Sequence, residues 1–62
     1  HLTAREQDVL GRLVDSQTEA AIADALGVSA HTVRSHVKNL YAKLQVHSRA
    51  QVVRVAYERG LV

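Results

Sequence analysis

Hydrophobic positions along this chain recur at steps of three and four residues, which is the period of an amphipathic α-helix. The clearest case is the segment 30–44, in which the apolar positions are Val33, Val37, Leu40 and Leu44. Alternation with period two is not sustained over any stretch, so strands are not expected. The pattern therefore predicts an all-α fold.

Capping residues divide the pattern into successive helices. Thr3 and Glu6 fit a capping box at the start of the first helix, and Thr18 precedes the short second helix. Ser29 precedes the third helix, which we expect to span 30–44. Gly27 ends the second helix, because glycine readily adopts the left-handed conformation that follows a helix end.

The fourth helix has weaker boundary signals. Ser48 with Gln51 suggests a second capping box, and Gly60 is expected to end the helix. No linker or repeat interrupts the pattern, so residues 1–62 are predicted to form one compact four-helix domain.

Two sides of the fourth helix are apolar. On one side Val53, Ala56 and Tyr57 are expected to close the core. On a neighbouring side, Val52, Val55 and Arg59 follow one another at steps of three and four residues. The two valines of this second set are expected to stay exposed.

The second and third helices together suggest a helix-turn-helix. Ala23 lies four positions before Gly27, and apolar residues surround this pair. Two helices that cross steeply after a short turn need a small side chain at the crossing, a glycine at the corner and apolar residues in the angle. An ordinary helical hairpin in a small bundle is the alternative.

Composition excludes several classes of protein. Cysteine, Phe and Trp are absent from the 62 residues. The core must therefore be aliphatic, and neither a disulfide framework nor a thiolate zinc site is available. There is no signal peptide pattern and no apolar run that could span a bilayer, so a cytoplasmic protein is expected. The chain is too short to enclose an active-site cleft, and we expect neither an enzyme nor a bound cofactor.

The distribution of charge is more informative than the net charge of +2. Residues 1–28 hold two basic and five acidic side chains, whereas residues 29–62 hold six basic and one acidic. Such an asymmetry indicates a polyanionic partner for the second half, most often nucleic acid. A merely solvated basic face is the alternative.

The third helix places this charge opposite its apolar stripe. At about 100° per residue, Arg34, Ser35 and Lys38 lie on one polar side together with His31. A helix fits the major groove, and its N-terminal residues approach the base edges. Arg34 can donate to two guanine acceptors, Lys38 can reach guanine or a phosphate, and Ser35 can donate or accept.

The segments LTARE, IADALGVSAHTVRSHVKNLYAKLQV, SRAQ and RGLV follow one known pattern. Over nearly its whole length the chain resembles the C-terminal DNA-binding domain of the LuxR/FixJ/GerE family of bacterial transcription regulators. The resemblance implies four helices, of which the third is the recognition helix. One departure is the segment QTEAAIA, which lacks the lysine that usually precedes the Ile-Ala pair.

The resemblance also assigns roles by position. Arg34, Ser35 and Lys38 fall where the family reads bases. A second group of residues is expected to contact phosphates. Three of them are assigned by position, namely Thr18, Thr32 and Lys43. The fourth is His31, which lies on the polar side of the third helix.

The family's fourth helix commonly forms the dimer contact. We therefore expect Val52, Val55 and Arg59 to pair two copies on duplex DNA while the free domain stays monomeric. Since the chain begins without Met, it is interpreted as part of a longer regulator. A missing N-terminal regulatory domain and RNA polymerase are the further partners expected.

Other constellations are weaker. His31 and His36 point about 140° apart on a helix, so no metal site is expected, and His36 is assigned to packing. Glu6 and Arg49 are a candidate structural ion pair across the fold. Two alternative functions remain, namely a sigma-factor-like promoter-reading domain and a protein-interaction module without DNA contact.

Overall fold

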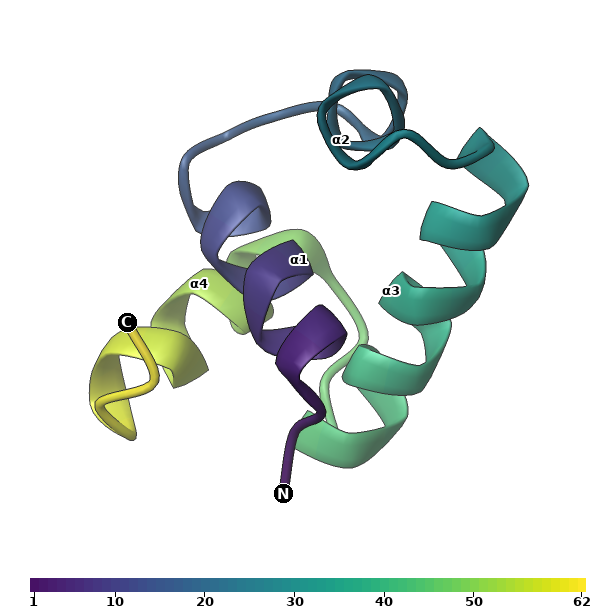
Figure 1. Ribbon diagram of the computed structural model, residues 1–62. Coiled ribbons are helices and arrows are strands. Elements are labelled where there is room, and N and C mark those ends of the chain that lie inside the picture. The colour runs from purple at the N-terminus through teal and green to yellow at the C-terminus, as the bar shows by residue number, and fades with distance from the viewer.

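The computed structural model describes all residues 1–62, and it confirms a compact all-α domain without strands. α1 (Ala4–Val14) lies between α3 (Ala30–Leu44) and α4 (Arg49–Glu58), and α2 (Glu19–Leu26) crosses the N-terminal end of α3 (Figure 1). None of the helices has the length and apolar character needed to span a bilayer.

The predicted N-terminal caps are confirmed. At the start of α1 the hydroxyl of Thr3 accepts from the Glu6 amide at 3.1 Å, and the Glu6 carboxylate accepts from the Thr3 amide at 2.9 Å. Thr18 and Ser29 cap α2 and α3 in the same way, each accepting from the amide three residues later. These contacts satisfy amide groups that a helix leaves without an internal partner.

The cap of α4 differs in one detail from its prediction. Ser48 accepts from the Gln51 amide, as expected. The Gln51 side chain, however, accepts from the amide of His47 at 2.6 Å and not from Ser48 itself. The capping box is therefore displaced by one residue into the α3–α4 turn.

The hydrophobic core is entirely aliphatic. The predicted stripe of α3 is confirmed, since its four apolar residues are all buried in the core, where α3 packs against α1, α2 and α4. The core consists of Val9, Leu10, Leu13, Ile22, Ala23, Val33, Val37, Leu40, Leu44, Val46, Val52, Val55 and Ala56.

The orientation of α4 contradicts part of the prediction. Val52 is 0% exposed and Val55 is 8% exposed, so the expectation that these valines face solvent is wrong. Tyr57 was expected in the core, yet it is 65% exposed. Ala56 is buried as predicted, and Val53 is half-buried. Apolar residues occupy more than half of the circumference of this helix. Its contact with α1 and α3 therefore selects which part of the apolar surface is buried.

Glu6 pairs with a different cation from the one expected. Its carboxylate lies 2.7 Å from Nζ of Lys43, and this ammonium also donates to the backbone carbonyl of His1 at 3.2 Å. The Glu6 side chain is only 6% exposed. The pair therefore connects the start of α1 to the last turn of α3.

Arg49 has a role that the sequence did not suggest. Its guanidinium donates to the carbonyl oxygens of Leu13, at 3.0 Å, and Gln17. The predicted Glu6–Arg49 ion pair is therefore wrong. Arg49 instead stabilises the carbonyl end of α1 and the following loop, where helix carbonyls lack internal partners and carry partial negative charge.

The Glu6–Lys43 pair should make stability depend on acid pH. The hydrogen bond from Lys43, and then that from the Thr3 amide, hold the pKa of Glu6 below its ordinary value of 4.5. The stabilisation is therefore present above about pH 4.5 and is lost as the pH falls through the lower pKa of the folded state. We expect the thermal midpoint of the wild type to fall more steeply below pH 4.5 than that of Glu6→Gln. Parallel curves for the two proteins would contradict this prediction.

Candidate nucleic-acid interface

The turn between α2 and α3 has the geometry of a helix-turn-helix. Gly27 adopts φ 69° and ψ 33°, a left-handed conformation that favours glycine. The amide of Val28 then donates to the carbonyl of Ala23 at 3.1 Å, and Ser29 begins the next helix. α2 is seen along its axis where α3 runs across the view, so the two helices cross steeply (Figure 1).

The side chains at this crossing are buried in the core. Ala23 is 4% exposed, and Ile22 and Val33 are fully buried in the angle between the helices. The small residue and the apolar set therefore lie where the sequence placed them. α3 is fixed on one side, and its opposite side is left to solvent.

The side of α3 that was predicted to contact DNA, which we call the reading face, is exposed. His31, Arg34, Ser35 and Lys38 are all solvent-exposed, and α3 contains no acidic residue. The hydroxyl of Ser35 donates to the backbone carbonyl of His31 at 3.3 Å, which leaves its oxygen able to accept a bond from a ligand. The structure thus brings these four residues together, as the helical spacing predicted.

The remaining candidates for phosphate contact are not all on this face. Thr18 is exposed and Thr32 is half-buried, and both hydroxyls take part in helix caps. Lys43 follows Arg34 by nine residues, which places it on the opposite side of α3. There its ammonium is bound to Glu6.

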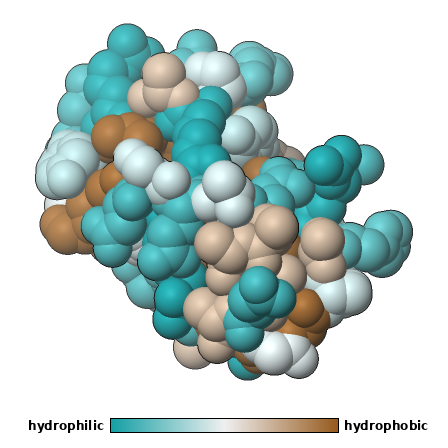
Figure 2. All heavy atoms as spheres, turned by 90° about the horizontal axis from the view of Figure 1, so that it is seen from above, coloured by the Kyte–Doolittle hydropathy of each residue, from teal (hydrophilic) through white to brown (hydrophobic).

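The outer surface of α2 carries no cation. In the view onto this helix, weakly apolar side chains gather over it (Figure 2). They include the exposed Ala20, Ala21 and Ala25, while the exposed Asp24 adds negative charge. α2 therefore offers a polyanion no cationic side chain.

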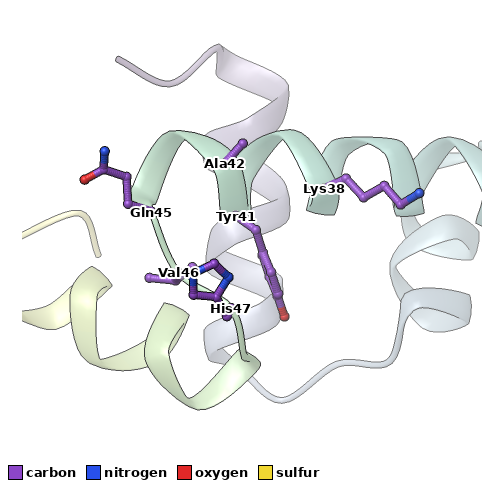
Figure 3. Close-up of a pocket in the computed structure, with 6 residues that line it drawn as sticks. All are labelled: Lys38, Tyr41, Ala42, Gln45, Val46 and His47. Atoms are coloured by element: carbon purple, nitrogen blue, oxygen red, sulfur yellow. The ribbon is translucent and has the colours of Figure 1, made fainter.

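An open groove continues the reading face toward the end of α3. It has a volume of about 580 Å³. The ring of Tyr41 and the imidazole of His47 both line it, whereas Lys38 extends along α3 toward α2 (Figure 3). Sequence reasoning missed Tyr41 and His47 as surface groups, although Tyr41 follows Lys38 by three residues and so shares its side of the helix. The groove is lined by Lys38, Tyr41, Ala42, Gln45, Val46 and His47.

Glu19 is a third residue that sequence reasoning missed, and it contacts the reading face directly. Glu19, the first residue of α2, places Oε1 3.2 Å from Nη2 of Arg34. No group of three or more His, Cys, Asp or Glu residues is placed to hold a metal ion. The site is therefore a cationic helix face with one carboxylate at its edge.

The comparisons with known proteins agree on one family. The sequence model described as "Bacterial regulatory proteins, luxR family" matches residues 1–56. The transcriptional regulatory protein MctR of Rhizobium johnstonii is 39% identical over 61 residues, which cover 98% of this chain and 28% of MctR. The probable transcriptional regulatory protein NarL of Mycobacterium tuberculosis is 44% identical over 61 residues, with the same two coverages, 98% and 28%. This chain thus spans less than a third of either relative.

Solved structures agree in fold. The response regulator ChrA of a heme-sensing two-component system superposes with a TM-score of 0.95 at 31% identity, over 100% of this chain and 31% of that one. VqmA of Vibrio cholera, solved as a complex with ligand and DNA, superposes with a TM-score of 0.91 at 34% identity, over 98% of this chain and 27% of that one.

Proposed function

Since the chain belongs to the luxR family of bacterial regulatory proteins, in which it is a helix-turn-helix DNA-binding domain, we propose that α3 enters the major groove of duplex DNA and reads its sequence. The family is not an enzyme family, so binding is the whole activity expected of the domain. The observation that carries the proposal is the exposed, acid-free face of a helix whose other side is locked into the core.

The residues of this face suit different contacts. Arg34 presents a planar fork that fits the O6 and N7 acceptors of guanine. Lys38 follows by four residues, one turn of helix later, and can reach a neighbouring guanine or a phosphate. Ser35 lies between them and contacts either base or backbone through its hydroxyl oxygen. Together they would read a short run of base pairs from one helix.

Phosphate contacts would hold the helix in register, as they do in most protein–DNA complexes. His31 and Thr32 lie in the first turn of α3, and Thr18 caps the start of α2, so all three would lie near the DNA backbone when α3 enters the major groove. Tyr41 and His47 line the open groove of the protein beside Lys38, and they would add further contacts to the DNA backbone.

Lys43 is a weaker candidate for phosphate contact than the family pattern implied. Its ammonium would have to leave the Glu6 carboxylate, 2.7 Å away, to reach DNA. We therefore assign a structural role to Lys43.

Pairing of two copies on DNA would use the outer side of α4. Val52 and Val55 are buried and unavailable, and without them Arg59 forms no apolar patch. The accessible side instead presents Ala50, Val53 and Tyr57 at steps of three and four residues. A patch of this size is too small for a stable dimer in solution, so two copies are expected to pair only on DNA with two half-sites.

The variant Tyr57→Glu tests this contact. Because Tyr57 is 65% exposed, its replacement should leave the helical circular dichroism signal and thermal midpoint close to those of the wild type. We expect cooperative binding to a two-half-site duplex to be lost, while binding to a single half-site is retained. Cooperativity equal to that of the wild type would remove this side of α4 from the interface.

The chain spans 28% of its relative MctR, so we propose that it is the DNA-binding part of a longer regulator. An N-terminal domain would receive the signal, and RNA polymerase would be a further partner of the assembled protein.

Selection of binding sites from a random duplex library tests the main proposal. We expect enrichment of one sequence, and an affinity for random duplex that falls steeply with salt because bound counterions are released. Absence of both enrichment and salt-dependent binding would overturn DNA reading in favour of a protein-interaction module.

A further inference from the structure

The arginine at the centre of the reading face is already held by a carboxylate. Nη2 of Arg34 lies 3.2 Å from Oε1 of Glu19, and the side chains are 67% and 33% exposed. Glu19 is the first residue of α2, where the partial positive charge of the helix N-terminus favours a carboxylate. The more buried partner thus anchors the more exposed one.

This contact exists only because of the helix-turn-helix crossing. α3 has no acid of its own, and the chain has none between Asp24 and Glu58. The carboxylate comes instead from the start of the neighbouring helix, fifteen positions before Arg34. It lies at the edge of the face that would meet DNA.

We propose that Glu19 is a specificity-determining residue, which orients the Arg34 guanidinium so that it discriminates its base pair more sharply. The proposal rests on the function proposed above. Arginine has five N–H donors, and the contact with Glu19 engages one nitrogen, which leaves others free for the two acceptors of guanine. A guanidinium that is already oriented loses less side-chain freedom when it binds.

The charge of Glu19 acts on specificity in a second way. A carboxylate at the edge of the interface repels phosphates whatever the base sequence is. α2 has no exposed lysine to offset this repulsion, because alanines occupy its outer side. Binding to random DNA is therefore weakened, while the oriented Arg34 supports binding to the correct site.

The same geometry allows an opposite role, in which Glu19 competes with DNA for Arg34. The two roles differ in what happens at one base pair. An orienting carboxylate sharpens the preference at the base pair that Arg34 reads. A competing carboxylate weakens binding to that site and leaves the preference unchanged, or blunts it.

The experiment compares Glu19→Gln with the wild type on three duplexes: the selected site, the same site changed at the base pair read by Arg34, and random sequence. Exposed ion pairs have modest strength, so we expect the preference at that base pair to fall about two- to fivefold. Removal of one negative charge near screened phosphates should raise affinity for random duplex about twofold. A preference that stays constant or increases would overturn the proposal.

Two further variants make the result specific. In an Arg34→Ala background, Glu19→Gln should no longer change the preference at this base pair, because its effect passes through Arg34. Asp24→Asn removes a charge from the same helix, at a carboxylate that forms no ion pair. It should change affinity for all three duplexes alike, and a loss of preference equal to that of Glu19→Gln would reduce the effect to general electrostatics.

The two proposals fail in different ways. Wild-type protein that enriches no sequence contradicts DNA reading itself. Wild-type protein that enriches a site, together with a Glu19→Gln variant that keeps the full preference, contradicts only the role of Glu19.

Discussion

Replacement of Val52 by glutamate is expected to unfold the domain. Val52 is 0% exposed and lies on the side of α4 that packs into the core. A carboxylate forced into this site must either remain charged without a partner or take up a proton, and both cost several kcal/mol. A domain of this length has a total stability of only about 3–9 kcal/mol. The folded state should therefore be lost or nearly lost at neutral pH.

Tyr57→Glu is the matched control, since it introduces the same side chain five positions later on the exposed side of the same helix. Urea unfolding followed by the helical circular dichroism signal compares the two variants. A cooperative transition of Val52→Glu close to that of the wild type would show that α4 can rotate or detach, and that its buried side is not fixed as described.

Arg34→Ala is expected to weaken binding to the selected site by about 1–3 kcal/mol, the usual contribution of a two-pronged arginine–guanine contact. The loss should be specific to one base pair, because the other bases are read by other side chains. Affinity for random duplex should change much less, through the removal of a single positive charge.

Competition binding with duplexes that differ at single positions measures this effect. Arg59→Ala removes the same charge from an exposed residue near the chain termini, away from the α2–α3 corner, and serves as the control. An equal loss of affinity on every duplex would reassign Arg34 from a base contact to a phosphate contact.

The helices and their ends were predictable because their signals are local. A cap joins residues three positions apart, so Thr3 with Glu6 could be recognised without knowledge of the fold. The stripe of α3 was equally clear, since apolar residues occupy only one narrow side of that helix. Exposure of Arg34, Ser35 and Lys38 follows directly from that stripe.

The sequence alone thus determined the four helices, the sharp turn at Gly27 and the side of α3 that faces solvent, because each depends on residues within a few turns of one another. Only the tertiary structure decided which side of α4 is buried, since its apolar residues cover more than half of the helix and contact with α1 and α3 selects among them. It also decided the ion pairs Glu6–Lys43 and Arg34–Glu19. Their partners are far apart in the sequence, and a charged side chain pairs with whichever opposite charge the packing of helices brings within reach.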